Sequence, residues 1–440
     1  MVLSQKLKVL MVVEQCNPDW TSVPLEGYQY FHAISKLADV TLVTHERNRK
    51  ALEKNEEDAK FVYVKESNFI TKYSSFSWRL AAPKGRVIWP LLHALGLPVH
   101  LDFNQKVFAK FKDRIQAEDY DLVHVLTPME PRYPFKIATA CRDTPFILGP
   151  VNGGVPFPSG FRSRAKREFA QLNFLRVIGR WLVPGYAETY KKADRILGGS
   201  TYTLNLIKSL FKLPDQKVSL FYENGVPDCF LNVVKQAKST DVINLLFVGR
   251  LVPYKCADIV IDALGCLEPS IQAKVKLTIV GDGTEKSFLE SKVQALGLEH
   301  LVLFTGLVDQ QQILKYYSEG DIFCFPSIRE YGGAVVLEAM ACGLPCIVAN
   351  NGGIGEYVTE STGFKIEPLS KEHLTQELAA KINLLVQDHA LRQRMSVQSV
   401  LRAQEFTWKR KAEKMLDVYQ EVVRERLPSP LHNTASKVSV

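Results

Sequence analysis

The sequence predicts an α/β protein with two doubly wound domains. The chain has 440 residues, which is too long for one ordinary hydrophobic core and suits two domains. Short apolar segments alternate along it with longer helical stretches, as expected for parallel sheets covered by helices on both faces. The alternation occurs as two series, separated by a polar, turn-rich stretch at residues 222–241.

Each series supplies its own set of expected strands. In the first series these are residues 8–14, 40–44, 61–64, 122–126, 145–149 and 195–199. In the second series they are residues 243–249, 276–281, 302–306, 321–326 and 345–349. The two series predict a first domain over 1–225 and a second over 226–407. Thr407 suits the N-cap of a last helix at about 408–426, and the polar residues 427–440 are expected to fray.

Composition narrows the class of protein. Hydrophobic residues make up 46% of the chain and charged residues 23%, as in globular proteins. The eight cysteines form no CxxC pair, so we expect reduced, buried thiols rather than disulfides or a metal site. The start of the chain lacks a signal-peptide pattern, and no apolar run reaches the roughly 18 residues of a membrane span. We expect a cytoplasmic protein, with peripheral contact at the inner face of a membrane as the alternative.

The net charge of +8 is concentrated in the first half of the chain. Residues 1–220 contain 32 lysines and arginines against 21 aspartates and glutamates. Residues 72–95 mix cations with two tryptophans, and residues 161–184 are rich in cations with apolar side chains at helical spacing. Such segments suit an anionic membrane surface, and the alternative is helices packed in the first domain with their arginines in water. No nucleic-acid-binding motif is present, so we expect no nucleic-acid partner.

The stretch "SIREYGGAVVLEAMACGLPCIV" contains the most informative residues. It reads as a loop after a buried strand, followed by a helix that ends near Gly343. Gly332 and Gly333 stand at the N-terminus of that helix, where unpaired amides and bare backbone favour an anion. Carboxylates would repel a phosphate, so Glu330 and Glu338 suit hydrogen bonds from sugar hydroxyls instead. The alternative is one capping carboxylate and one surface glutamate.

A second loop supplies cations at the same predicted edge of the sheet. The segment "LLFVGRLVPYK" ends a strand at Gly249 and then places Arg250 and Lys255 on the following loop. Together they could bracket a diphosphate, the arginine through its planar fork and the lysine as a point charge. Taken alone, they could equally be two solvated cations. The glycine-bearing turn of "VGDGTE" at residues 280–285 follows a third strand of this series.

The ordered set "FVGRL…K", "IVGDG", "FTGLV", "FPSIREYGGAVVLEAMACGLPCIV" and "NGGIGEYV" resembles the retaining glycosyltransferases of family 4. The resemblance implies their GT-B architecture, in which two Rossmann-like domains face each other across a cleft. Glu330 and Glu338, with seven residues between them, match the family's E-x7-E signature. The resemblance covers about residues 195–425. It implies a sugar transfer from a nucleotide-sugar donor with no metal or other cofactor, because cations and a helix N-terminus stabilise the leaving diphosphate. It also implies that the last helix crosses back onto the first domain.

The resemblance assigns roles to individual residues. It implies that Arg250 and Lys255 neutralise the donor diphosphate and that Glu330 binds the hydroxyls of the donor sugar; these three are the expected catalytic residues. Glu338 would hold the nucleotide ribose. The remaining expected donor contacts are backbone groups at Gly249, Gly306, Leu307, Gly332, Gly333, Ala334 and Val335.

The acceptor side is expected in the first domain. The family has a glycine-rich loop after its first strand, where this chain has only Gly27. A family histidine near a strand end corresponds to the region of His124, whose alternative is a core histidine with satisfied hydrogen bonds. Asn152, Gly153 and Gly154 follow another strand and resemble a loop that faces the cleft, or form a plain connection.

The resulting prediction is a retaining glycosyltransferase that acts on a glycan, a lipid-linked or a small-molecule hydroxyl acceptor. A sugar-nucleotide hydrolase or epimerase on the same fold is one rival, which donor turnover without acceptor would favour. A non-catalytic nucleotide-sugar-binding subunit is the other, which donor binding without turnover would favour. A dinucleotide dehydrogenase is disfavoured because no GxGxxG follows the first strand.

Overall fold

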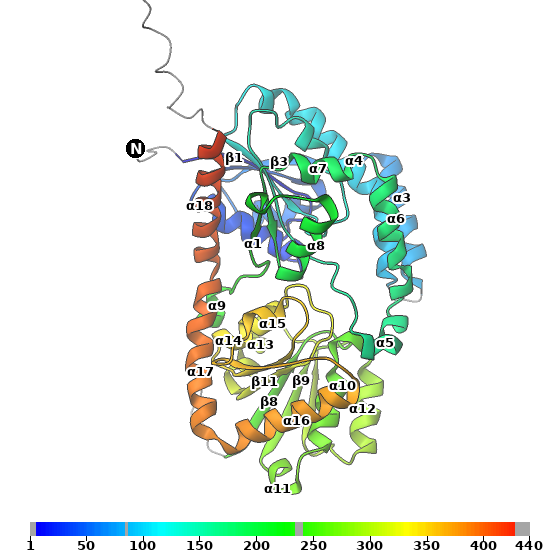
Figure 1. The fold of residues 1–440 in the computed structure, drawn as a ribbon, viewed down its shortest axis with the longest axis vertical. Helices are drawn as coiled ribbons and strands as arrows, with labels where there is room; N and C mark the ends of the chain where they lie inside the picture. The colour runs from blue at the N-terminus through cyan, green and yellow to red at the C-terminus, as the bar shows by residue number, and fades with distance from the viewer. Residues whose placement is uncertain (1–5, 84–86, 234–240, 427–440) are drawn as a thin grey trace, which may run out of the picture.

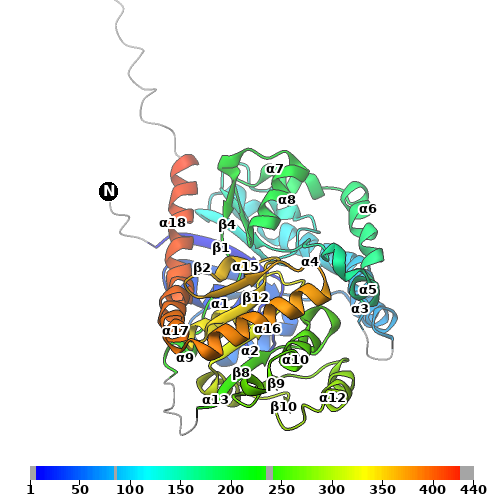
Figure 2. The same cartoon turned by 60° about the horizontal axis from the view of Figure 1, so that its bottom comes forward.

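The computed structural model describes residues 6–83, 87–233 and 241–426, so the predicted frayed tail lies outside the described residues. It contains two parallel sheets, each flanked by helices, stacked one above the other in Figure 1. Figure 2 views the same arrangement with the second domain brought forward.

The first sheet has seven strands in the order β3-β2-β1-β4-β5-β6-β7, all pairing in parallel. Six of them match predicted strands, and the three-residue β7 was missed. The strands are β1 (Lys8–Val13), β2 (Asp39–His45), β3 (Lys60–Val64), β4 (Leu122–Thr127), β5 (Phe146–Val151), β6 (Arg195–Gly198) and β7 (Val218–Leu220).

The second sheet has six parallel strands in the order β10-β9-β8-β11-β12-β13. Five match predicted strands, and β13 was missed. They are β8 (Ile243–Val248), β9 (Val275–Val280), β10 (Val302–Gly306), β11 (Ile322–Phe325), β12 (Cys346–Ala349) and β13 (Gly363–Ile366). The strand order reverses between β8 and β11, and ligands of open α/β sheets bind at the carboxyl ends of strands at such a point.

Helices connect the strands and cover both sheets. Those before β8 are α1 (Val23–Ser35), α2 (Arg49–Asn55), α3 (Asn68–Ala81), α4 (Trp89–Gln116), α5 (Arg162–Arg167), α6 (Phe174–Leu182), α7 (Tyr186–Lys192), α8 (Thr201–Phe211) and α9 (Asp228–Leu231). Those after it are α10 (Ala257–Gly265), α11 (Pro269–Gln272), α12 (Lys286–Ala295), α13 (Gln310–Glu319), α14 (Ala334–Ala341), α15 (Ile354–Tyr357), α16 (Lys371–Gln387), α17 (His389–Ala403) and α18 (Trp408–Arg426).

The last helix crosses from the second domain to the first. In Figure 1, α17 lies along the second domain and α18 continues upward along the first. The buried side chains Trp408, Met415 and Tyr419 of α18 belong to one hydrophobic cluster with Tyr30 and Phe31 of α1. This burial of apolar surface ties the C-terminal helix to the first sheet.

The chain also crosses between the domains on the opposite side of the molecule, at α5 (Figure 1). Phe161 is buried in the hydrophobic core of the second domain, although it lies within the range 1–225 expected for the first. Arg164 pairs with Asp258, and Arg167 pairs with Glu285. This part of the predicted membrane segment 161–184 therefore faces the second domain, which is a correction to that prediction.

Candidate active site

Three neighbouring strands of the second sheet end in closely packed glycines. The Gly249 N–H donates to the Val280 carbonyl (2.9 Å), and the Gly281 N–H donates to the Gly306 carbonyl (3.0 Å). A Cβ at Gly281 would lie 2.0 Å from the Gly249 carbonyl oxygen, so a side chain there would collide with backbone. The absence of side chains leaves bare backbone along this edge.

Glu330 lies beyond the carboxyl end of β11 and forms an ion pair with Lys255. The two side chains are only 15% and 12% exposed, so water screens their interaction weakly. The Ser327 hydroxyl donates to Glu330 Oε2 (3.2 Å), and the Lys255 ammonium lies 4.9 Å from the centre of the Phe325 ring. Two residues that stand 75 positions apart in sequence thus meet at the strand ends.

Arg250 is exposed and lies on the cleft side of the same loop. Its Nη2 donates to the Tyr254 hydroxyl (2.8 Å), and its guanidinium carbon lies 6.0 Å from the centre of the Trp89 ring. Trp89 is the first residue of α4 in the first domain, so Arg250 reaches toward the facing wall. Burial raises the pKa of Tyr254 to about 12, which keeps it a neutral hydrogen-bond partner at neutral pH.

The N-terminus of α14 is capped from the interdomain connection. When the Asn224 amide is oriented so that its nitrogen donates to Glu26, its oxygen accepts from the Gly333 N–H (3.1 Å) and the Ala334 N–H (3.3 Å). Gly332 lies against this amide, with only 2.0 Å between a constructed Cβ and the Asn224 side chain. In this structure, two of the amides expected to meet the donor are therefore bound internally.

A buried charged network supports Asn224. Glu26 comes from α1, Glu223 from the connection and Lys411 from α18. Burial raises the pKa of both carboxyls, and their mutual repulsion raises that of Glu26 further. Burial lowers the pKa of Lys411 to about 7, although the neighbouring carboxyls oppose this shift. The Asn152 amide donates to Glu223 Oε2 (2.7 Å) and completes the network.

Glu338 lies within α14 and accepts a hydrogen bond from the Tyr317 hydroxyl (2.8 Å) of α13. Burial raises the pKa of Glu338 to about 7, and this hydrogen bond opposes the shift. Val335 is half-buried on the same helix, and its carbonyl also lies within reach of Tyr317 (3.4 Å). Leu307 follows Gly306 and is 80% exposed.

A cavity of about 710 Å³ lies between the two domains. Of the predicted catalytic and donor residues, Arg250 and Glu330 line it. Lys255 is not among the lining residues, but it forms an ion pair with Glu330, which is. The first-domain wall comes from the end of β1, from α3 and α4, and from the segment after β4. Its lining includes Glu14, Arg47, Trp78, Trp89, His93, His100, Glu130, Arg132 and Tyr133.

The acceptor-side predictions for His124 and Gly27 are wrong. His124 is fully buried in β4, where one ring nitrogen bonds the Tyr419 hydroxyl (2.6 Å) and the other the Gly149 carbonyl (2.6 Å). Burial lowers its pKa to about 4, so it is a neutral core histidine. Gly27 lies inside α1, where a Cβ would approach the Gln15 carbonyl oxygen to 2.3 Å. It allows close packing of helix and strand, and it does not line the cleft.

Asn152, Gly153 and Gly154 are also buried and do not line the cleft, contrary to expectation. Asn152 Oδ1 accepts from the hydroxyls of Ser200 (3.0 Å) and Thr203 (2.9 Å). These bonds fasten the end of β5 to the start of α8, so the segment supports the Glu223 network from behind.

Sequence reasoning missed Glu14 and His100, an acidic residue and a histidine that line the first-domain wall. Glu14 directly follows β1, and its Oε2 lies 2.9 Å from His100 Nδ1. His100 Nε2 lies 3.0 Å from the Pro134 carbonyl oxygen. Burial would raise the pKa of Glu14, but His100 and Arg47 lower it below its usual value. A glutamate at the carboxyl end of the first apolar strand was the available signal, whereas nothing in the sequence pairs it with His100.

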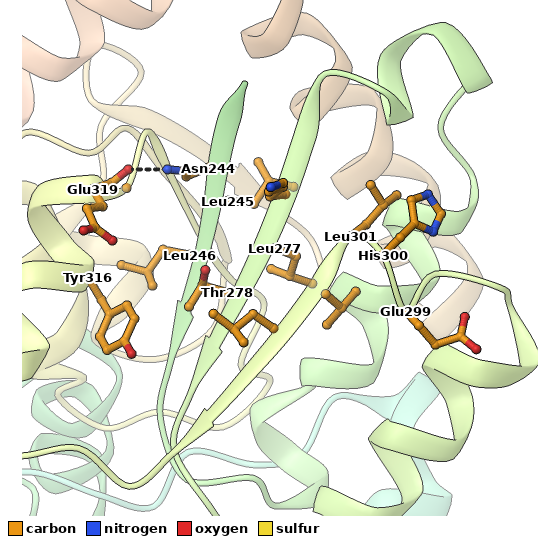
Figure 3. A pocket seen from close by; sticks show the side chains of 14 residues that line it. Asn244, Leu245, Leu246, Leu277, Thr278, Glu299, His300, Leu301, Tyr316 and Glu319 are labelled. Carbon is orange, nitrogen blue, oxygen red and sulfur yellow. Dashed lines mark hydrogen bonds between the residues drawn. The ribbon is translucent and has the colours of Figure 1, made fainter. Parts of the chain in front are cut away.

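A second hollow of about 380 Å³ lies at the opposite, amino-terminal edge of the second sheet. Figure 3 shows Leu245, Leu277 and Leu301 around it, with Glu299 and His300 at one side and Tyr316 at the other. It contains none of the predicted site residues.

Within the described part of the chain, His, Cys, Asp and Glu side chains form no group of three or more placed to bind a metal ion. Nor does any helix there have the length and apolar character needed to span a bilayer.

Known proteins share both the fold and part of the sequence. Residues 231–399 match the family model described as Glycosyl transferases group 1. The D-inositol 3-phosphate glycosyltransferase of Kineococcus radiotolerans is 32% identical over 195 residues, or 41% of this chain and 45% of that protein. The chain thus spans about half the length of the curated relatives it matches.

Two solved structures illustrate the likeness in fold. Anabaena Alr3699/HepE in complex with UDP has a TM-score of 0.61 at 17% identity, with 94% of this chain and all of that chain covered. Sucrose-phosphate synthase of Thermosynechococcus elongatus has a TM-score of 0.64 at 17% identity, over 96% and 100% of the two chains.

The two facing parallel sheets and these likenesses define the GT-B architecture, so the predicted fold class is confirmed. The match of residues 231–399 to the glycosyl transferases group 1 model agrees with the resemblance to glycosyltransferases drawn from the motifs.

Proposed function

We propose that the protein transfers a sugar from a nucleoside diphosphate sugar to a hydroxyl acceptor, with retention of anomeric configuration. The observation that carries this proposal is the meeting of Arg250, Lys255, Glu330 and the N-terminus of α14 at the strand ends beside the cleft. Two cations and a helix N-terminus suit a leaving diphosphate, and a carboxylate between them suits sugar hydroxyls.

The proposed reaction exchanges two bonds at the anomeric carbon. The bond to the diphosphate oxygen breaks, and the bond to the acceptor oxygen forms on the same face of the sugar. Arg250 and Lys255 stabilise the negative charge on the leaving group. The departing phosphate oxygen takes the proton of the incoming hydroxyl, so the step needs no nucleophile from the enzyme and no metal.

The donor would displace an internal cap. Its diphosphate oxygens would replace the Asn224 oxygen at the Gly333 and Ala334 amides, with Glu338 accepting the ribose hydroxyls and the backbone at Gly306 and Leu307 facing the base. The UDP held by the similar structure of Anabaena HepE makes uridine donors the first to test.

The acceptor would occupy the first-domain half of the cleft. Trp78 and Trp89 offer aromatic faces on which a sugar ring can stack, and Arg47 and Arg132 provide positive charge for an anionic substituent. Relatives named D-inositol 3-phosphate glycosyltransferase add a cyclic polyol phosphate to the acceptors worth testing. Glycans and lipid-linked acceptors complete that panel.

Calorimetric titration with UDP-, GDP- and ADP-sugars tests donor binding, and NMR of the product tests the stereochemistry. We expect one donor class to bind, and an α-linked donor to give an α-linked product. A β-linked product would overturn retention. Donor turnover without any acceptor would favour a hydrolase or epimerase, and binding without turnover across the acceptor panel would favour a binding subunit.

A membrane surface is proposed on the outer side of the first domain. The exposed apolar side chains there lie on α3 and α6, which both pack against α4 and stand at the same side of the molecule in Figure 1. Neither helix contains an acidic residue, and Lys72 and Arg79 of α3 are exposed. The apolar set is Phe69, Phe76, Leu80, Phe174, Ile178 and Leu182. This combination fits the interface of an anionic bilayer at the inner face of a membrane.

Replacing Phe76 and Leu182 together by aspartate should weaken binding to phosphatidylglycerol vesicles by about ten-fold or more, because each apolar side chain contributes roughly 1.5–3 kcal/mol when buried. Vesicle co-sedimentation measures this effect. Phe288→Asp is the matched control, since Phe288 is an exposed aromatic residue of the second domain. Equal sedimentation of the double variant and the control would refute the proposed surface.

A further inference from the structure

The α5 segment belongs to the second domain in space. Just before α5 the backbone packs closely against the second domain, because a Cβ at Gly160 would lie 1.9 Å from the Leu369 carbonyl oxygen. Phe161 then inserts into the core of the second domain. The chain leaves the first domain after β5 and returns to it at α6 (Figure 1). It therefore forms a strap from the first domain onto the second, residues 155–168.

Arg164 is the most extensively bonded side chain of the strap. Its two terminal nitrogens bind the Asp258 carboxylate in a fork, at 3.0 Å and 2.7 Å. Nη1 also donates to the Pro253 carbonyl (2.7 Å) and to Cys256 Sγ (3.1 Å). The side chain is only 11% exposed, so these bonds are formed largely away from water.

All three partners of Arg164 surround Lys255. Pro253 and Cys256 flank it on the β8–α10 loop, and Asp258 lies in the first turn of α10. Cys256 has φ = 62°, a left-handed conformation that is strained for a residue with a side chain and needs support from its surroundings. Arg164 holds the loop on both sides of this strained residue.

The loop has support from its other side as well. The Ile328 N–H donates to the Tyr254 carbonyl (3.0 Å), and the Ser327 hydroxyl lies 3.3 Å from the same oxygen. The loop is thus clamped between the β11 loop, which carries Glu330, and the strap. A buried arginine–carboxylate pair is a weak source of stability, because desolvation offsets much of its attraction, whereas its forked geometry fixes position well.

We propose that Arg164 is a positioning residue, which sets the place of Lys255 and Arg250 for a diphosphate although it comes from the first half of the chain. This inference rests on the proposed function. Arg164 acts through the Pro253 carbonyl and α10, without touching the ligand. The position of the strap on the second domain thereby fixes the positions of the two cations of the proposed donor site.

Calorimetric titration with UDP of Arg164→Ala, Arg164→Lys and the control Arg162→Ala tests the inference. Arg162 is an exposed cation of the same short helix. Lysine can keep a charge contact with Asp258 but cannot also bridge to the Pro253 carbonyl, so Arg164→Lys should fold and still lose positioning. We expect both Arg164 variants to bind UDP about ten-fold more weakly, as misplacement of binding groups by about 1 Å would cause. Arg162→Ala should bind as the wild type does.

Hydrogen exchange separates failure of this inference from failure of the proposed function. Peptides covering residues 249–258 should exchange faster in Arg164→Lys, while those from β1 and β4 should not change. If wild-type protein does not bind UDP, the proposed uridine donor fails and the exchange result still tests the positioning role. Wild-type affinity and exchange in Arg164→Lys, with a change only in melting temperature, would overturn it.

Discussion

Replacing Lys255 by alanine should lower the rate of sugar transfer by roughly 10²–10³-fold, the usual effect of removing one group that stabilises developing charge. Lys255 is poorly exposed and forms an ion pair with Glu330, so its charge lies within the proposed donor site. The measurement is kcat with the donor found by titration. Lys274→Ala is the matched control, because Lys274 is exposed at the opposite edge of the same sheet.

One indirect effect has to be separated from this loss. Without Lys255, the Glu330 carboxylate lacks its counter-charge and would repel the diphosphate. The double variant Lys255→Ala, Glu330→Gln removes that repulsion. We expect the double variant to stay as slow as the single one, because the ammonium itself acts on the leaving group. Recovery of more than about a third of wild-type kcat would show that Lys255 serves only to neutralise Glu330.

The affinity for UDP-glucose should rise about ten-fold between pH 6 and pH 8 in the wild-type protein, and should be independent of pH in Glu338→Gln. Burial raises the pKa of Glu338 to about 7, and only the ionised carboxylate can accept two ribose hydroxyl bonds. Only protein with an ionised Glu338 therefore binds well, and this form makes up about a tenth of the protein at pH 6 and most of it at pH 8. A sugar ester of UDP is the suitable probe, since its diphosphate does not titrate in this range.

The same group affects folding with the opposite sign. The folded chain holds the Glu338 proton more tightly than the unfolded chain does, because the folded pKa is above the usual 4.5. Its contribution to stability is therefore present below pH 4.5 and is lost as the pH rises through about 7. A melting temperature that falls over this range in the wild type, and less so in Glu338→Gln, would agree with that sign. A pH-independent UDP-glucose affinity in the wild type would contradict the ribose role.

The fold, and the edge of the second sheet at the carboxyl ends of its strands, could be predicted from the sequence for a physical reason. Strands buried on both faces are continuous apolar runs, so all eleven predicted strands are present. The strands β7 and β13 were missed, because their sequences VSL and GFKI are not continuous apolar runs. Glu330 and Arg250 stand on loops that follow apolar strands, and parallel strands bring their carboxyl ends to one edge.

The first-domain wall could not be predicted in the same way. Trp78 and His100 lie on helices and reach the cleft only through the packing of α3 and α4. His124 stands in a strand whose other neighbours are apolar, and its partner Tyr419 lies 295 positions away. Composition cannot tell such a core histidine from one at the strand end.

The strap limits how this protein can be divided. A fragment cut at the sequence boundary, residues 226–407, would lack Phe161 and leave a void in its own core. Removing a buried phenylalanine costs about 3–5 kcal/mol, a large share of the stability of most domains. Asp258 would also lose the arginine that neutralises it. A dissected second domain should therefore be soluble and able to hold nucleotide only when residues 155–168 are returned to it as a separate peptide.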